Sequence, residues 1–506
     1  MMDGVLQGVV TAFTTYNIMM VAVGCFAGTF IGMLPGLGPI SAIALMIPIT
    51  YGMDPSSGLI LIAGVYYGAI FGGSTSSILI NAPGVAGTVA SSFDGYPMAK
   101  NGQAGKALAI AAYSSFTGGT IAAIFLLFAA PALASVSLSF QSSDYFALMV
   151  LGLTAVAAFA GKGKFLKAAI MTIFGLMLAT VGTDSDSGIA RFTFGRLDLI
   201  DGISFLLLAM AAFALSEAMM NILDNKEQTQ AEKDALKKDI GSLKITRAEV
   251  KEMAPTVGRS SVLGFFVGVL PGAGATIASF LAYGMERSFA NVKEKLKFGK
   301  GSIKGLAAPE SANNAACSGS FVPLLTLGIP GSGTTAIILG ALISYGIQPG
   351  PTMYVDNPAL FWSVIISMYI GNVVLLILNL PLIPYIAKLL TLPKQLLLPL
   401  IIFFSLIGVY LVTFNNFDIY MMTLFAIVAL FLRIIDFPMA PMILGFILGG
   451  MMEDNLRRAL TISDGSLAFL WERPITLSIL VLTILVLLMP VISDYFAKIK
   501  EKRKAL

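Results

Sequence analysis

Hydroxyl and amide side chains gather in two stretches of this sequence, each beside a break that Pro and Gly impose. Such groups donate and accept hydrogen bonds without carrying charge, so in apolar surroundings they suit the binding of a carboxylate or a cation. Ser and Thr also let helices pack closely, and that alternative stays open for each residue. The candidate binding residues are Ser74, Thr75, Ser76, Ser77, Asn81, Asn313, Asn314, Ser318, Ser320, Thr326, Ser332, Thr334 and Thr335.

The breaks themselves form a repeated pattern. Gly32-Met33-Leu34-Pro35-Gly36-Leu37-Gly38-Pro39 recurs as Gly268-Val269-Leu270-Pro271-Gly272-Ala273-Gly274-Ala275, at an offset of 268 − 32 = 236 residues. A second pair, Asn81-Ala82-Pro83-Gly84 and Gly328-Ile329-Pro330-Gly331, is offset by 330 − 83 = 247. Pro removes a backbone donor and Gly permits left-handed backbone, so helices end here. The residues expected at hairpin tips and helix breaks are Pro35, Gly36, Gly38, Pro83, Gly84, Pro271, Gly272, Gly274, Pro330 and Gly331.

The composition is that of a polytopic helical membrane protein. The chain is 57% hydrophobic and 12% charged, with a mean hydropathy of +0.86, whereas soluble domains are about a quarter charged. It contains no histidine, which excludes histidine-based acid–base catalysis and histidine-ligated metal sites. Its two cysteines lie in apolar segments, so no disulfide framework is expected. Met1-Met2-Asp3-Gly4 lacks the basic flank of a cleavable signal peptide, so none is expected.

The repeated motifs divide the chain into three parts. Residues 1–223 are expected to form a first membrane repeat, 224–257 a charged cytoplasmic connector, and 258–506 a second repeat with an extra C-terminal span. Part of the connector, 244–257, could instead form an amphipathic helix at the membrane interface. Residues 5–20 are interpreted as either a span or an interfacial helix.

Each copy of the first motif predicts a re-entrant hairpin. The arms read as 21–33 and 40–50 in the first copy, and as 260–270 and 275–285 in the second, which is too short to span a bilayer. A single long kinked helix is the alternative. The remaining spans are expected at 55–99, 107–130, 144–160, 165–182, 202–222, 309–346, 359–388, 397–413, 419–433, 439–452 and 475–497.

Lys and Arg in the connecting loops predict which side of the membrane each loop faces. Lys162, Lys164 and Lys167 are assigned to the cytoplasm, whereas Asp184 and Asp186 lie outside. Arg191, Arg457 and Arg458 fall outside in the same scheme, against the usual preference. Five spans between the two hairpins give the halves inverted topology, a common arrangement in transporters.

Few charged residues lie near the candidate site. Glu310 could carry a proton or face a cation, but the favoured interpretation is that it caps the start of its helix. Asp94 and Lys100 are interpreted as loop-edge residues. No basic residue is expected in the core, so helix ends and neutral donors are expected to bind an anion.

The motifs together resemble the large membrane subunit of the tripartite tricarboxylate transporter family. Besides the breaks, the resemblance rests on stretches that follow the family's order through nearly the whole chain, namely Tyr66-Tyr67-Gly68-Ala69-Ile70-Phe71-Gly72-Gly73-Ser74, Phe93-Asp94-Gly95-Tyr96-Pro97-Met98-Ala99-Lys100, Ala308-Pro309-Glu310-Ser311-Ala312-Asn313-Asn314-Ala315 and Glu453-Asp454-Asn455-Leu456-Arg457-Arg458-Ala459-Leu460. It implies a multi-pass permease of the bacterial inner (plasma) membrane that works with a small membrane subunit and a periplasmic substrate-binding protein.

The sequence therefore predicts an all-α polytopic membrane protein that acts as a binding-protein-dependent secondary active transporter. Two inverted repeats with re-entrant hairpins and interrupted helices are expected to move a site by alternating access, in an elevator-like manner by analogy. The imported substrate would be a tricarboxylate or related organic acid, in symport with sodium or protons. No cofactor or nucleic acid is expected, no metal site is assigned, and a homo-oligomer is one option. An organic-anion channel with two pore hairpins is the alternative. Enzyme motifs such as His-Glu-x-x-His are absent, so no enzymatic activity is expected.

Overall fold

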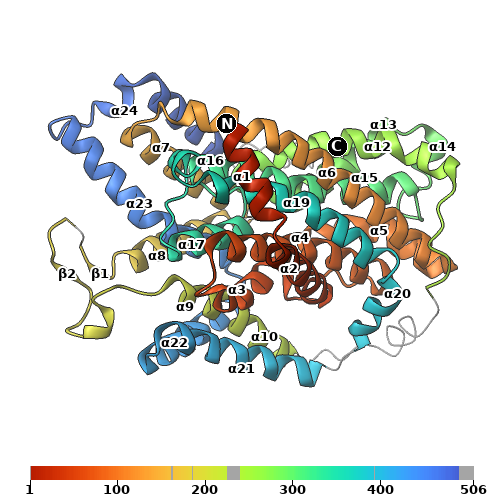
Figure 1. Cartoon of the computed structure of the whole chain (residues 1–506), viewed down its shortest axis with the longest axis horizontal. Coiled ribbons are helices and arrows are strands. Elements are labelled where there is room, and N and C mark those ends of the chain that lie inside the picture. Colours follow the sequence, from red (N-terminus) through yellow and green to blue (C-terminus); the bar gives the residue numbers. More distant parts are fainter. Residues whose placement is uncertain (1, 161–162, 185, 225–239, 392–393, 489–506) are drawn as a thin grey trace, which may run out of the picture.

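The computed structural model describes residues 2–160, 163–184, 186–224, 240–391 and 394–488, and almost all regular structure in them is helical (Figure 1). Six of the described helices are long and apolar enough to cross a membrane. The prediction of an all-α polytopic membrane protein is thereby confirmed. Residues 225–239 of the predicted connector and the end of the last predicted span, from 489 onward, lie outside the described residues.

The elements before the connector contain the first hairpin, α2 and α3, the long buried helix α4 and further helical segments on either side of them. They are α1 (Met2–Ala12), α2 (Thr15–Met33), α3 (Gly38–Thr50), α4 (Pro55–Ile80), η1 (Ala86–Thr88), α5 (Val89–Met98), η2 (Ala99–Gln103), α6 (Ala104–Ser137), α7 (Ser142–Ala158), α8 (Phe165–Ala179), β1 (Gly182–Thr183), β2 (Ala190–Arg191), η3 (Leu197–Leu199), α9 (Phe205–Ala209), η4 (Met210–Leu215) and α10 (Ser216–Asp224).

The elements after the connector begin with the second hairpin. They are α12 (Arg247–Val269), α13 (Gly274–Phe289), α14 (Val292–Lys295), α15 (Ile303–Gly319), α16 (Phe321–Leu327), α17 (Gly333–Ser344), α18 (Pro351–Asp356), α19 (Pro358–Asn379), α20 (Ile383–Ile386), η5 (Ala387–Thr391), α21 (Lys394–Thr413), α22 (Asn416–Ile434), α23 (Ala440–Ile462), α24 (Phe469–Glu472) and a last helix, Pro474–Leu488.

The two hairpins pack in the same way against the helix that follows each of them. A Cβ atom added to Gly32 on α2 would lie 2.2 Å from the carbonyl oxygen of Ala69 on α4. A Cβ atom added to Gly268 on α12 would lie 2.2 Å from the carbonyl oxygen of Ala316 on α15. The glycines are 268 − 32 = 236 residues apart and the carbonyls 316 − 69 = 247, the same offsets that separate the sequence motifs. Small residues therefore allow backbone-to-backbone contact at equivalent points of both halves.

The helix breaks in the two halves also share their backbone conformation. Asn81 (φ 54°) ends α4 and Gly328 (φ 69°) ends α16, both in the left-handed region. Their separation is again 328 − 81 = 247 residues. Left-handed residues after the last helical turn satisfy its carbonyl groups and stop the helix. The inverted orientation of the halves, which needs a membrane to define it, stays a prediction.

The first arm of each hairpin is longer than the sequence suggested. Helix α2 begins at Thr15, because Thr14 caps it by accepting a hydrogen bond from the Asn17 amide (3.2 Å), and it runs for 19 residues. Helix α12 has 23 residues and includes 247–257, most of the stretch 244–257 considered as an interfacial helix. The expectation of two short arms was wrong for α2 and α12, whereas α3 has 13 residues and α13 has 16.

Asp94 does not lie at a loop edge, contrary to the sequence interpretation. It lies on α5 and is fully buried. Its Oδ1 accepts hydrogen bonds from the backbone amides of Gly299 (2.8 Å), Gly301 (2.9 Å) and Ser302 (2.7 Å), and its Oδ2 accepts one from the Tyr283 hydroxyl (3.1 Å). This carboxylate fixes the loop before α15 onto the first half of the chain. Lys100, by contrast, is exposed on η2.

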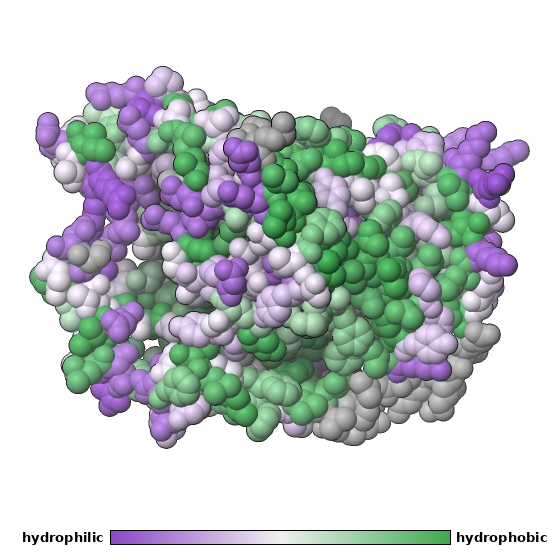
Figure 2. Space-filling view, in the orientation of Figure 1, coloured by the Kyte–Doolittle hydropathy of each residue, from purple (hydrophilic) through white to green (hydrophobic). Residues whose placement is uncertain are grey.

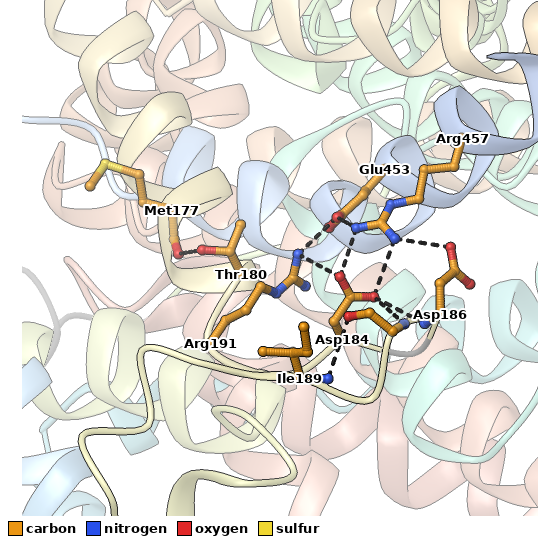
Figure 3. A network of polar contacts seen from close by, with 9 residues as sticks. Met177, Thr180, Asp184, Asp186, Ile189, Arg191, Glu453 and Arg457 are labelled. Carbon is orange, nitrogen blue, oxygen red and sulfur yellow. Dashed lines mark hydrogen bonds and ion pairs between the residues drawn. The ribbon is translucent and has the colours of Figure 1, made fainter. Parts of the chain in front are cut away.

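A short β-hairpin between α8 and α9 was not predicted. Strands β1 and β2 pair antiparallel, with Gly182 opposite Arg191. Arg457 on α23 donates to Asp184 (Nη2–Oδ2 2.8 Å), Asp186 (3.0 Å) and Glu453 (2.6 Å), and Arg191 donates to Glu453 (2.8 Å), as Figure 3 shows. The network joins residues that the sequence assigns to one side of the membrane, so those assignments agree with one another.

Polar side chains gather toward the left and right ends of the visible face, and apolar ones cover much of its middle (Figure 2). The β1–β2 hairpin lies at one of these ends and α14, with its basic flanks, at the other (Figure 1). This distribution is that of a protein whose middle faces lipid.

We predict that Gly268→Ala destabilises the protein while Gly258→Ala on the same helix does not. A Cβ atom at position 268 would overlap the Ala316 carbonyl, whereas nothing lies within 4 Å of one at position 258. Overpacking of this kind costs about 1–3 kcal/mol. Thermal unfolding in detergent would measure the difference, and equal melting temperatures for both variants would contradict the close contact.

We also predict that the β-hairpin leaves α23 in acid. The Arg457 guanidinium, which donates to Asp184, lowers the pKa of that carboxyl well below its ordinary value. A lowered pKa means that the ion pairs stabilise the attachment above about pH 4 and are lost as the pH falls further. Hydrogen exchange of residues 186–202, corrected for its intrinsic pH dependence, should rise in that range.

Arg457→Gln should give the same rise near neutral pH, and Arg458→Gln serves as the control because Arg458 is exposed next to it. Protection that is unchanged in Arg457→Gln would show that the ion pairs do not hold the hairpin.

Candidate functional site

Both hairpin tips line a single cavity of about 1210 Å³. The first tip contributes Gly36, Leu37, Gly38 and Pro39, and the second contributes Gly272, Ala273, Gly274 and Ala275. The four tip glycines have φ values of 94°, 57°, 79° and 60°, a conformation that other residues adopt only with strain. Pro35 and Pro271 precede the tips and are not among the described residues that line the cavity.

Residues that follow the second pair of helix breaks line the same cavity. Val85, Ala86 and Gly87 line it from the first half, and Ser332, Gly333 and Thr334 line it from the second. The Gly272 amide donates to the Gly331 carbonyl (3.0 Å), which joins the second tip to the second break. A Cβ atom on Gly84 would lie 1.9 Å from the Gly32 carbonyl, so the first tip and first break are equally close. Pro83 and Pro330 lie within these joined segments but not in the lining of the cavity.

Four helices begin at residues that line the cavity. They are α3 at Gly38, α13 at Gly274, α17 at Gly333 and α23 at Ala440. The first residues of α3, α13 and α23 receive no side-chain cap, whereas Ser332 and Thr335 cap α17. Uncapped N-termini present free N–H groups and the positive end of the helix dipole, so they attract anions.

A basic side chain also lines this cavity, contrary to the sequence expectation. Arg433, in the last turn of α22, forms an ion pair with Glu217 on α10, and both residues line the cavity. Its Nη2 donates to the Ala212 carbonyl (3.0 Å), and its guanidinium lies 5.9 Å from the centre of the Phe213 ring. A Cβ atom on Gly36 would lie 3.1 Å from Glu217 Oε1, so the acid also contacts the first hairpin tip.

One signal in the sequence could have found this pair. Arg433 is the only charged residue from 419 to 435, and Glu217 is the only one from 204 to 223. Lone charges within apolar segments are costly and are commonly functional. The sequence does not reveal that the two lie together, because 216 residues separate them.

The predicted polar residues fall into three groups. Ser332 and Thr334 line the large cavity. Ser74 and Thr75 line a separate small cavity of about 10 Å³ beside Glu310, discussed below. The others lie outside both linings: Ser76, Ser77, Asn81, Asn313, Asn314, Ser318, Ser320, Thr326 and Thr335.

Several residues of the third group shape the breaks. Ser76 Oγ accepts a hydrogen bond from the Gly84 amide (3.2 Å), and Ser77 Oγ donates to the Gly73 carbonyl (2.7 Å). Ser320 and Thr326 donate to carbonyls of their own helical segments, at Cys317 (2.7 Å) and Val322 (2.6 Å). These contacts position the backbone, and they leave the ligand role of each residue untested.

The buried asparagines lie directly behind the cavity wall. A Cβ atom on Gly87, a lining residue, would lie 2.7 Å from Asn313 Oδ1. Neither amide atom of Asn313, nor Asn314 Oδ1, nor Ser318 Oγ has a hydrogen-bond partner in the described part of the chain. Buried amides without partners are expensive, so they are candidates for ligand contacts.

Glu310 does not cap its helix, contrary to the favoured interpretation. Ser302 caps α15 by accepting from the Gly305 amide (3.1 Å), and Glu310 lies in the middle of the helix and is fully buried. Its Oε2 accepts hydrogen bonds from Ser74 (2.8 Å) and Ser115 (2.8 Å). Among the described residues, no group of three His, Cys, Asp or Glu side chains could hold a metal ion.

The sequence is similar to a known protein family and to two proteins of one bacterium. Residues 18–444 match the model of the tripartite tricarboxylate transporter TctA family. An Agrobacterium vitis protein named "Uncharacterized 52.8 kDa protein in TAR-I ttuC' 3'region" is 44% identical over 473 residues, which cover 94% of this chain and 93% of that protein. A second protein of that organism, "Uncharacterized protein in TAR-II ttuC' 3'region", is 47% identical over 217 residues, 43% of this chain and 89% of the relative.

No solved structure matches the chain. The family model covers far more than half of the sequence, and the first relative is aligned over nearly its full length. Membership of this family implies a role in transport together with two further components, a binding protein and a small membrane subunit. The chain therefore belongs to the TctA family of tripartite tricarboxylate transporters.

Proposed function

We propose that this chain is the permease subunit that imports a tricarboxylate or related organic acid across the bacterial inner membrane. A periplasmic binding protein delivers the acid, and a cation gradient of sodium or protons drives its accumulation. One observation supports this function above others: two glycine-rich hairpin tips, four helix N-termini and Arg433 meet at one cavity.

The cavity suits a multiply charged anion. A helix N-terminus stabilises a nearby negative charge by about 0.3–1 kcal/mol. The four helices that begin at this cavity come from different parts of the sequence. The hydroxyl groups of Ser41, Tyr66, Thr276, Ser332 and Thr334 are on lining residues and can donate further hydrogen bonds. Several carboxylates of one substrate can thus be bound at once, which favours a tricarboxylate over a monocarboxylate.

The position of the cavity supports alternating access. It extends to the loop between α7 and α8, where Gly163 and Leu166 are exposed. Lys164 and Lys167 in this region indicate that the loop faces the cytoplasm. In this proposal the structure is taken as an inward-facing state, and the hairpins of two inverted repeats would carry the site to the other side, as in an elevator.

Uptake into proteoliposomes would test this function. Vesicles containing the chain and its small membrane subunit, with the binding protein and labelled citrate outside, should accumulate citrate above equilibrium when a sodium or proton gradient is imposed. Equilibration without accumulation and without dependence on the binding protein would instead indicate the alternative, an organic-anion channel. Failure to carry any of a panel of di- and tricarboxylates would reject the proposed substrate class.

We predict that neutralising the two members of the Arg433–Glu217 pair changes substrate affinity in opposite directions. Arg433→Gln removes a charged donor, and a hydrogen bond to a charged group contributes about 1.5–3 kcal/mol, so the KM for citrate should rise about 10-fold or more. Glu217→Gln removes the carboxylate that competes with the substrate for Arg433, so KM should fall.

A purely structural ion pair gives another pattern. Both variants would then yield less folded protein and proportionally less transport activity, and their KM values would not shift in opposite directions. Arg458→Gln, the same substitution at an exposed position, provides the control for the change in overall charge. KM values that rise alike in both variants would contradict a direct role of Arg433 in anion binding.

A further inference from the structure

The carboxyl group of Glu310 lies where the two halves of the chain meet. Ser74 on α4 and Ser115 on α6 both donate to its Oε2, and Ser91 on α5 is also placed to interact with the carboxyl. Oε1 has no hydrogen-bond partner in the described part of the chain. Glu310 is a residue of the second half, whereas all three hydroxyl groups belong to the first.

In the described part of the chain, no cationic side chain acts on this carboxyl. The groups that act on it are the hydroxyls of Ser74, Ser91 and Ser115. The ionisable side chains on α15 itself, on the helices packed against it and on α19 are Tyr66, Tyr67, Asp94, Tyr96, Lys106, Tyr113, Arg247, Glu249, Lys251, Glu252, Arg259, Tyr283, Glu286, Arg287, Lys304, Cys317 and Tyr369. An ionised carboxylate at full burial, with one oxygen unbonded and no counter-charge, is strongly disfavoured relative to the neutral acid.

Glu286 shows how the same chain pairs another buried carboxyl with a basic side chain. It is nearly fully buried on α13, and Arg259 donates to both of its oxygens (2.9 Å each), with Thr256 donating a third hydrogen bond (2.8 Å). Glu310 has hydroxyl donors on one oxygen only. The contrast between the two sites indicates that Glu310 is built to be neutral in this state.

A small cavity of about 10 Å³ adjoins this carboxyl. Ser74, Thr75, Ser115, Glu310 and Asn379 line it together with apolar residues, and Asn379 Oδ1 has no hydrogen-bond partner among the described residues. Its volume is close to the minimum for one water molecule. A single water between the carboxyl and the amide oxygen could pass a proton to or from Glu310.

We propose that Glu310 is the coupling site of the transporter and that the coupling ion is a proton. The proposal rests on the transport function proposed above. The step is a simple protonation: a hydronium ion gives up a proton, its O–H bond breaks, an O–H bond forms at Oε1, and a neutral carboxyl and a water molecule result. Release of the proton to water reverses the step, and no oxidation or reduction is involved.

Protonation then controls whether the halves can pack closely. The neutral acid is compatible with the buried contacts that α15 makes with α4 and α6 in this state. The carboxylate requires water or a counter-ion, so deprotonation opens the interface and favours a state in which Glu310 is hydrated. A proton on Glu310 therefore favours the arrangement in which the two halves pack closely.

Infrared spectroscopy tests the protonation state without needing a substrate. Near neutral pH the purified membrane complex should show the carbonyl stretch of a protonated carboxylic acid, which shifts on exchange into deuterated water. Glu310→Gln should lose this band. Glu252→Gln, the same change at an exposed position of α12, should keep it. A spectrum in which Glu310→Gln and Glu252→Gln are identical overturns the proposal.

A milder variant decides the question if Glu310→Gln fails to fold. Ser115→Ala removes one of the two hydrogen bonds to Oε2, so the carbonyl band should persist and move to higher frequency. A band that does not move would assign it to another carboxyl group and would reject Glu310 as its source.

Transport measurements complete the test. They use proteoliposomes that contain the chain and the small membrane subunit, with the binding protein and labelled citrate outside. An inward proton gradient should drive accumulation by the wild type, whereas Glu310→Gln should keep citrate counterflow but lose accumulation. Accumulation driven by sodium alone, or retained in Glu310→Gln, overturns the proposal. If the wild type carries no citrate, the proposed substrate fails, and the infrared result still decides the protonation of Glu310.

Discussion

A helix that begins inside a bilayer leaves its first backbone N–H groups without intrahelical partners, and the protein must provide for them. In this chain α3, α13 and α23 begin without a side-chain cap, and each begins at a residue that lines the same cavity. Their free donors therefore face a shared space and not lipid. Under the proposed function, an anion in that space would lower the electrostatic cost of the breaks, because helix N-termini stabilise negative charge.

The arrangement depends on close contact between backbones. Glycine at Gly32 and Gly268 lets each hairpin lie directly on the helix behind it, and a side chain at either position would displace the tip. One tip alone would offer one helix N-terminus. Because the same contact occurs in both halves, both tips reach the cavity, as the proposed binding of a multiply charged anion requires.

Much of this could be predicted from the sequence, because proline and glycine act locally. The four breaks, their two offsets and the ends of the helices follow from residues such as Gly36 and Gly274, whose conformational preferences need no tertiary information. The lengths of α2 and α12 were underestimated because the residues before each predicted arm were assigned to other segments, 5–20 to a separate span or interfacial helix and 244–257 to the connector.

The positions of the charged side chains could not be predicted in this way. Arg433 pairs with Glu217 across 216 residues, and Glu310 meets Ser74 across 236. Such pairs depend on how helices from the two halves pack, which local patterns do not specify. Glu310 was interpreted as a cap because acidic residues commonly lie at helix starts, but here Ser302 already caps α15.

Asp94 and Glu310 show what the packing of the halves achieves. Each is a fully buried carboxyl that contacts the other half, Asp94 through three backbone amides and Tyr283, Glu310 through serine hydroxyls. Backbone amides in a loop are fixed donors that can only stabilise negative charge. Serine hydroxyls rotate and can either donate or accept, so they satisfy a carboxylate and a carboxylic acid equally well. The first contact is therefore suited to holding the halves together permanently, and the second to changing its protonation state.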